Sequence, residues 1–167
     1  PDDIVNLRKL EFLNLNFNRL RELPKGIGQL GNLSQLYLRN NQLSCLPQEM
    51  IQLRNLSQLD LKNNQLKTLP EDFIRLENLK FLNLNFNQLE ELPEDFTLLK
   101  NLIYLHIRSN RLKDLPKKIY RLENLFYLDI SSNEIRELPR EIIYLEKLKR
   151  FDVEKNPMTF PPVEIVD

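Results

Sequence analysis

Residues 56–78 read LSQLDLKNNQLKTLPEDFIRLEN, and the next 23 residues repeat the same arrangement of leucines, asparagines and one proline. The shared pattern is L-x-x-L-x-L-x-x-N-x-L-x-x-L-P-x-x-I-x-x-L-x-N, with Phe or Met in some units at the isoleucine position. Its first leucine recurs every 23 residues, at Leu10, Leu33, Leu56, Leu79, Leu102, Leu125 and Leu148. A fixed period of this length indicates a stacked array in which each unit packs against its neighbours.

We interpret residues 1–167 as one repeat domain. Residues 10–147 hold six full units, and residues 148–167 hold a truncated seventh unit that loses the pattern after Asn156. Residues 1–9 match the last third of a preceding unit, so we expect the chain to belong to a longer array.

The C-terminal end of the pattern is marked by proline. Pro161 and Pro162 follow the last unit, and a double proline extends neither a helix nor a strand ladder. The regular array is therefore expected to stop there.

Composition excludes several classes of function. Hydrophobic residues make up 41% of the chain and charged residues 29%, which is typical of a globular protein. The 24 basic and 24 acidic side chains balance, so no electrostatic attraction favours nucleic acid or an anionic membrane. No apolar run approaches the roughly 20 residues of a transmembrane helix. Cys45 is the only cysteine and His106 the only histidine, so neither a disulfide nor a metal site built on these residues is expected, and no cofactor is predicted.

The repeat also predicts its own local structure. The last two leucines of L-x-x-L-x-L alternate with polar residues, which is the periodicity of a β-strand with one buried face. Successive strands should lie parallel, about 4.8 Å apart. In Pro70-Glu71-Asp72 the proline followed by acidic residues suits the first turn of a helix. The segment is short, so one turn or a 3₁₀ helix is expected on the opposite side of the core.

Seven in-register copies resemble the leucine-rich-repeat family over essentially the whole chain. The second half, L-P-x-x-[IFM]-x-x-L, looks like the 23-residue subtype of bacterial secreted proteins such as those of Leptospira. The same subtype occurs in eukaryotic scaffolds of the scribble and Ras-group-related kind. The closing segment that begins at Asn156 is similar to that of such scaffolds and of Roco-type GTPases.

The resemblance implies an α/β fold, a right-handed leucine-rich-repeat solenoid with a concave parallel β-sheet and short helical or 3₁₀ turns on its convex side. It leaves the compartment open: secreted or on the cell surface for a bacterial protein, cytoplasmic for a eukaryotic scaffold.

One asparagine column follows the strands. Its members are Asn18, Asn41, Asn64, Asn87, Asn110, Asn133 and Asn156. A ligand-binding role is conceivable, but a structural role is favoured, because an amide offers two donors and an acceptor to backbone groups buried where the chain turns inward. We predict a ladder of such bonds.

The outward strand positions carry what is particular to this chain. Phe81, Tyr104 and Tyr127 recur on three adjacent strands and should form an aromatic strip, flanked by His106 and Arg108. Aromatic and arginine side chains are common anchors of protein interfaces. Stiffening of the sheet by cross-strand packing is the alternative. The full set of predicted partner-binding residues is Tyr37, Phe81, Tyr104, His106, Arg108, Tyr127 and Asp129.

Charges on the same face are unevenly distributed. Basic residues lie toward the N-terminal strands at Arg39, Lys62 and Arg108, and acidic residues toward the C-terminal strands at Asp129, Asp152 and Glu154. Such a bipolar face orients a partner or is an ordinary solvated surface.

Two further phenylalanines stand beside the ladder. Phe17 and Phe86 both occur in the string L-N-L-N-F-N, and units one and four are otherwise close copies. Duplication with partial burial at the turn is the expected explanation.

The predicted function is that of a protein–protein interaction module rather than an enzyme, because one histidine without a nucleophile beside it gives no catalytic arrangement. One alternative is the regulatory repeat region of a larger signalling enzyme such as a Roco GTPase. Another is a glycan-binding surface protein. A strand missing before Leu10 would leave an open edge, so self-association through the uncapped N-terminal end is also predicted.

Overall fold

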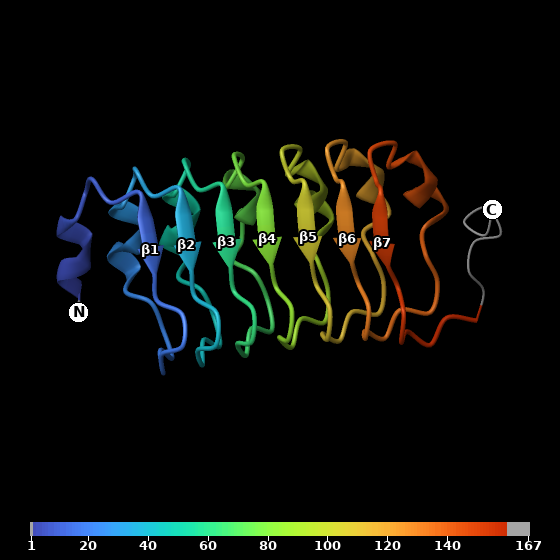
Figure 1. The fold of residues 1–167 in the computed structure, drawn as a ribbon, viewed down its shortest axis with the longest axis horizontal. Helices are drawn as coiled ribbons and strands as arrows, with labels where there is room; N and C mark the ends of the chain where they lie inside the picture. Colours follow the sequence, from blue (N-terminus) through green and yellow to red (C-terminus); the bar gives the residue numbers. More distant parts are fainter. Residues whose placement is uncertain (1, 160–167) are drawn as a thin grey trace.

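The computed structural model describes residues 2–159 and shows one strand for each repeat (Figure 1). The seven strands form one parallel sheet in sequence order: β1 Phe12–Asn14, β2 Gln35–Tyr37, β3 Gln58–Asp60, β4 Phe81–Asn83, β5 Tyr104–His106, β6 Tyr127–Asp129 and β7 Arg150–Asp152. Short 3₁₀ helices η2 to η7 lie behind the sheet, and η1 lies beyond β1 at its N-terminal end. Their bounds are η1 Asp2–Asn6, η2 Lys25–Gln29, η3 Gln48–Gln52, η4 Phe73–Arg75, η5 Glu94–Leu98, η6 Ile119–Arg121 and η7 Arg140–Tyr144. The predicted leucine-rich-repeat solenoid is confirmed.

Each strand pairs with the next in the register that the period demands. Leu59 of β3, for example, lies beside Leu82 of β4, which lies beside Leu105 of β5. In these strands the middle residue is buried and the first and third residues face the other way. The first and third strand residues therefore form one continuous surface, which we call the sheet face.

Proline is the N-cap of η2, η3, η5 and η7, one position before the first-turn position that the sequence suggested, whereas η4 and η6 begin after Asp72 and Lys118. Pro93 has an extended backbone at the N-cap, and its carbonyl accepts a hydrogen bond of 2.9 Å from the backbone N–H of Phe96. In the third unit the expectation of a helical first turn at Glu71 and Asp72 is wrong. There Asp72 adopts a left-handed φ of 56°, and the helix begins only at Phe73.

The core is a stack of identical leucine columns. Leu36, Leu59, Leu82, Leu105 and Leu128 are each 0% exposed. At the ends of the sheet the corresponding side chains, Leu13 and Phe151, are only partly buried because each has a neighbour on one side. Burial is thus a property of the stack and not of a single unit.

The asparagine column forms cross-repeat hydrogen bonds. The Asn87 side chain donates to the carbonyls of Leu61 and Leu84, both at 3.0 Å, and its Oδ1 accepts from the N–H of Leu66 at 3.0 Å. Asn41, Asn64, Asn110, Asn133 and Asn156 repeat this arrangement. Asn18 is exposed and donates only to carbonyls of its own unit, at Leu15 and Asn16.

A second asparagine column closes the other end of units one to five. Each member donates a 2.8 Å hydrogen bond to a carbonyl of the preceding unit: Asn32 to Arg8, Asn55 to Gly31, Asn78 to Arg54, Asn101 to Glu77 and Asn124 to Lys100. In units two to five, two asparagines therefore tie neighbouring repeats together.

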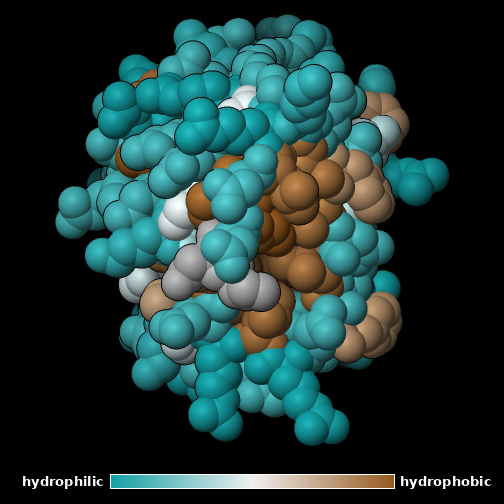
Figure 2. All heavy atoms as spheres, turned by 90° about the vertical axis from the view of Figure 1, so that its left-hand side faces the viewer, coloured by the Kyte–Doolittle hydropathy of each residue, from teal (hydrophilic) through white to brown (hydrophobic). Residues whose placement is uncertain are grey.

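The N-terminal end of the stack is apolar. Figure 2 looks onto this end and shows a brown hydrophobic area framed by hydrophilic side chains. Leu7 is exposed, and Leu10 and Leu13 are only partly covered. Self-association through this end stays a prediction. Among residues 2–159, no helix is both long and apolar enough to span a bilayer.

Candidate functional site

Five rings meet on the sheet face over β4, β5 and β6. Ring centroids are 6.5 Å apart for Phe81 and Tyr104, 5.4 Å for Phe81 and His106, and 4.8 Å for His106 and Tyr127. Phe126, just before β6, adds a fifth ring 6.0 Å from Tyr104. We call Phe81, Tyr104, His106, Phe126 and Tyr127 the aromatic cluster.

The register of the sheet explains why these rings meet. Phe81, Tyr104 and Tyr127 are direct partners on consecutive strands, so parallel pairing places their side chains in one row. Tyr104 remains 41% exposed and Phe126 37%, which is unusual for rings of this size in mutual contact. The cluster therefore presents a preassembled apolar surface with polar tips to a partner.

Electrostatics at the centre of the cluster are governed by burial. Burial lowers the pKa of the His106 imidazole, and the carboxylates of Asp129 and Asp60 only partly oppose this effect. Burial likewise raises the pKa of Tyr127, helped by the negative charges of Asp129 and Asp152. His106 is thus held neutral among the rings near neutral pH.

A pH-dependent stability follows from His106. Its pKa is lowered from 6.5 in the folded chain, so the unfolded chain binds more protons as the pH falls below 6.5. Stability that is complete above pH 6.5 should then decrease between that pH and the lower folded-state pKa. Thermal melts at pH 8, 6.5 and 5 of the parent and of His106→Gln would measure the difference. An identical pH slope in both proteins would contradict the effect.

Charged side chains border the cluster on its C-terminal side. Tyr127 donates a hydrogen bond of 3.3 Å from its hydroxyl to Oδ2 of Asp152. Arg108 lies 3.8 Å from the carboxylate of Glu154, reaching across β6. Arg108 therefore offsets the negative charge of Glu154. Of the charge separation expected from the sequence, only the basic Arg39 and Lys62 and the acidic Asp152 remain.

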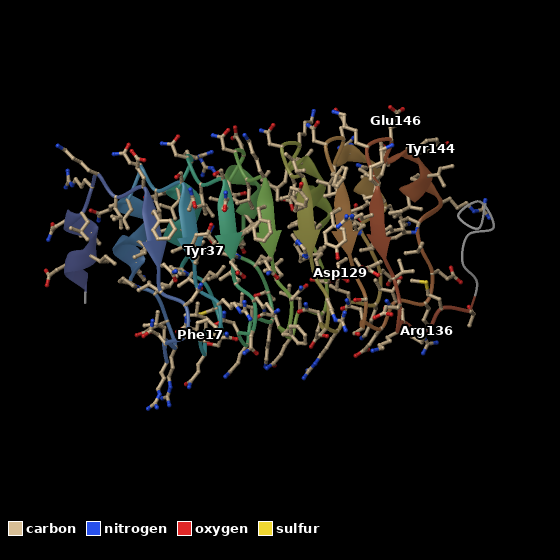
Figure 3. The ribbon with its side chains drawn as sticks, viewed as in Figure 1. Phe17, Tyr37, Asp129, Arg136, Tyr144 and Glu146 are labelled. Carbon is tan, nitrogen blue, oxygen red and sulfur yellow. The ribbon has the colours of Figure 1, made fainter. Side chains whose placement is uncertain are left out.

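Asp129 does not lie open on the sheet face. It is only 5% exposed, at the C-terminal end of β6 (Figure 3), and its Oδ1 accepts hydrogen bonds from the backbone N–H and the hydroxyl of Ser131, at 3.0 and 2.6 Å. This predicted partner-binding residue therefore also serves the local structure of the turn. The same holds for Asn85, whose Oδ1 accepts from the Arg108 N–H at 2.6 Å, because these side chains satisfy backbone groups where the strand ends.

Tyr37 lies away from the cluster on β2. Its ring centroid is 5.5 Å from that of Phe12, and its hydroxyl donates to Oε1 of Gln58 at 2.6 Å. Figure 3 shows Tyr37 on the N-terminal half of the sheet. The structure therefore brings four of the seven predicted partner-binding residues, Phe81, Tyr104, His106 and Tyr127, into the aromatic cluster and leaves Tyr37 outside it.

Two observations on aromatic residues differ from the sequence analysis. Phe126 was not predicted, although the L-F-Y-L-D string of residues 125–129 carries two adjacent rings that could have indicated it. Phe17, predicted to be partly buried at its turn, is 70% exposed. Phe86, at the equivalent position, is 43% exposed.

Other surfaces offer less chemistry. A hollow of about 830 Å³ beside the loops of units three to five is lined mainly by charged and small apolar side chains from residues 67–68, 90–94 and 113–116. Within residues 2–159, no group of three or more His, Cys, Asp and Glu side chains is arranged to hold a metal ion. The aromatic cluster is the best-defined candidate site.

Comparison with protein families matches residues 9–30, 31–89 and 92–158 to leucine-rich-repeat models. None of the curated proteins compared with the chain matches it.

Solved structures match over nearly the whole chain. A leucine-rich-repeat protein of Leptospira interrogans is 42% identical with a TM-score of 0.96, over 99% of this chain and 42% of its own. The ectodomain of the Arabidopsis thaliana membrane receptor kinase GASSHO1/SCHENGEN3, solved with CASPARIAN STRIP INTEGRITY FACTOR 2, is 30% identical with a TM-score of 0.90. The match extends over 99% of this chain and over 21% of the receptor ectodomain. The plant peptide hormone receptor RGFR1, in complex with RGF2, is 32% identical with a TM-score of 0.84, over 93% of this chain and 26% of its own.

The chain thus spans less than half the length of these structures. Its period, its asparagine ladder, its sheet and the extent of the family match all agree, and the chain belongs to the leucine-rich-repeat family.

Proposed function

We propose that the chain is a protein-binding module that takes a peptide or protein segment on its sheet face, with the aromatic cluster as the anchor. The observation that carries this proposal is the contact of five rings on adjacent strands, two of which, Tyr104 and Phe126, stay more than a third exposed. Preassembled aromatic side chains lose little conformational entropy on binding, and they commonly supply most of the affinity of an interface.

The solved structures support the same class of partner. The two receptor proteins are described with CASPARIAN STRIP INTEGRITY FACTOR 2 and with the RGF2 ligand of a peptide hormone receptor. Their similarity to this chain makes a peptide or protein ligand the favoured class.

The arrangement of polar groups suggests how a partner segment is oriented. Tyr127 and Asp152 provide a hydrogen-bonded pair at one border of the cluster, whereas the half-buried His106 at its centre has a lowered pKa and is neutral near neutral pH. A segment with an apolar residue over Tyr104 and a donor toward Asp152 fits these groups best.

Selection from a displayed peptide library on the immobilised chain tests the proposal. The selected peptide should bind Tyr104→Ala/Tyr127→Ala at least tenfold more weakly, because truncating two aromatic anchors commonly costs about 2 kcal/mol or more. Affinity is measured by isothermal titration calorimetry, with circular dichroism to confirm the fold.

The chain offers a matched control on the opposite side of the sheet. Tyr120 and Tyr144 form another ring pair, 6.4 Å apart, on η6 and η7. Tyr120→Ala/Tyr144→Ala also removes two tyrosine rings, and it should leave the affinity for the peptide unchanged. Equal affinity of the parent and the Tyr104→Ala/Tyr127→Ala variant would refute the proposed site. Preferential binding of the chain to a glycan array would show that the ligand is a glycan and not a peptide.

A further inference from the structure

A second surface lies where the strands end, on the N-terminal half of the stack. The eighth residue of each repeat has a left-handed φ between 55° and 57°; these residues are Phe17, Asn40, Asn63, Phe86, Ser109, Ser132 and Lys155. Asparagine tolerates this conformation, but a bulky side chain there is a rare and strained choice. Phe17 and Phe86 are therefore exceptional among the seven.

The two phenylalanines gain little stability for this strain. Phe17 is 70% exposed and so contributes little apolar burial, and Phe86 still leaves 43% of its surface exposed. Figure 3 shows Phe17 at the C-terminal end of β1, projecting from the sheet near its border. Strained residues that do not serve the core are a recognised mark of functional surfaces.

Each exposed ring is paired with a cation. The Arg39 guanidinium carbon is 5.4 Å from the Phe17 ring centroid, and Lys62 Nζ is 5.3 Å from the Phe86 ring centroid. Between the two pairs, the Asn63 amide donates a 2.6 Å hydrogen bond to Oδ1 of Asn40. The sequence of groups across the strands is therefore ring, cation, cation, ring.

Neither cation forms an ion pair in the part of the chain that the structure describes. Over residues 2–159, no carboxylate oxygen lies within 4.0 Å of the charged nitrogens of Arg39 or Lys62. Asp60 interacts electrostatically with both cations, but its Oδ1 accepts a hydrogen bond from the backbone N–H of Lys62 and forms no ion pair with either side chain.

We propose that Phe17, Arg39, Lys62 and Phe86 form a docking edge for an acidic segment of a partner protein that carries apolar residues on both sides of its carboxylates. The positive charge of two adjacent unpaired cations favours carboxylates, and the two flanking rings favour apolar side chains. This docking edge shares no residue with the aromatic cluster, so it stands apart from the proposed function.

Strand spacing gives the dimension of the partner segment. Phe17 and Phe86 are three repeats apart, which corresponds to about 14 Å at about 4.8 Å per strand. An extended chain advances about 3.3 Å per residue, so the apolar residues should be about four positions apart. The acidic residues then lie over Arg39 and Lys62.

Nuclear magnetic resonance of the ¹⁵N-labelled chain tests the docking edge. The probe is a peptide pool with Leu or Phe at two positions four residues apart and two glutamates between them. The control pool has lysines in place of the glutamates. The backbone amide signals of Arg39, Asn40, Lys62 and Asn63 should shift with the acidic pool and stay unchanged with the lysine pool.

A variant that preserves the fold separates binding from structure. Phe17→Asn/Phe86→Asn installs the residue that the chain itself uses at Asn40 and Asn63, so its melting temperature should equal or exceed that of the parent. Its affinity for the acidic pool should fall at least tenfold, while Tyr104→Ala/Tyr127→Ala should bind the pool like the parent.

Several outcomes would overturn the docking edge. These are equal shifts with both pools, no shift at these amides, or an undiminished affinity of Phe17→Asn/Phe86→Asn. If sedimentation shows that the parent self-associates and this double variant does not, the occupant is a second copy of the chain and the proposal of an acidic partner segment is wrong.

Discussion

Replacing Asn87 by alanine should lower the free energy of unfolding by about 1–3 kcal/mol, because it leaves buried backbone groups without partners. The Asn87 side chain makes three hydrogen bonds of 3.0 Å, to Leu61, Leu66 and Leu84, and is 8% exposed. For a chain of this size, each 1 kcal/mol corresponds to a decrease of about 2–4 °C in the melting temperature. Differential scanning calorimetry measures the change.

Asn18 is the matched control for Asn87. It occupies the same place in the repeat, but it is exposed and its side chain donates only within its own unit. Asn18→Ala should change stability by no more than about 0.5 kcal/mol. A melting temperature of Asn87→Ala equal to that of the parent would contradict a stabilising asparagine ladder.

Replacing Leu82 by alanine should be more damaging, with an expected loss of about 2–5 kcal/mol. Leu82 is completely buried at the centre of β4, between Leu59 and Leu105 in adjacent strands. The cavity therefore weakens the contacts of one repeat with both of its neighbours, on which the stability of a repeat array depends. Chemical denaturation followed by circular dichroism measures the loss.

Leu98 provides a control of identical chemistry. It lies on η5 and is 40% exposed, so Leu98→Ala removes the same atoms without opening an enclosed cavity. Its effect should stay within about 0.5 kcal/mol. Comparable losses for Leu82→Ala and Leu98→Ala would show that stability does not reside in the stacked leucine columns.

The fold could be predicted almost completely because every unit repeats the same physical requirement. The spacing of Leu82 and Leu105 specifies both the period and the register, since a shift of one residue would turn every leucine out of the core. The 3₁₀ helices followed from the short interval after proline. The left-handed turn at Asp72 could not be predicted. Aspartate tolerates a left-handed backbone, but the presence of an aspartate does not show that the backbone at that position is left-handed.

The candidate site was only partly predictable. The row Phe81, Tyr104 and Tyr127 follows from register alone, but the burial of Asp129 depends on Ser131 two residues later. Phe126 was missed because its position lies before the strand, outside the alternation that marks outward residues. The Phe126 ring reaches Tyr104 from a position before the strand, and the Asp129 carboxylate bonds to Ser131 instead of facing solvent. A periodic sequence pattern shows neither contact.

The partner-binding surface was inferred from residues free of the repeat pattern, and this inference fails where such residues serve local structure. Asn85 and Asp129 satisfy backbone N–H groups of the turns, whereas Phe17 and Phe86 contribute little to the core. Freedom from the repeat pattern thus identified a mixture of turn-stabilising and exposed residues.

The location of partner binding can be read from one tyrosine spectrum. The chain contains five tyrosines: Tyr37, Tyr104, Tyr120, Tyr127 and Tyr144. With ring-labelled tyrosine and the selected peptide added stepwise, the signals of Tyr104 and Tyr127 should shift and broaden while those of Tyr120 and Tyr144 stay in place. Shifts at Tyr120 and Tyr144 with unmoved Tyr104 and Tyr127 signals would locate binding behind the sheet and contradict recognition by the aromatic cluster.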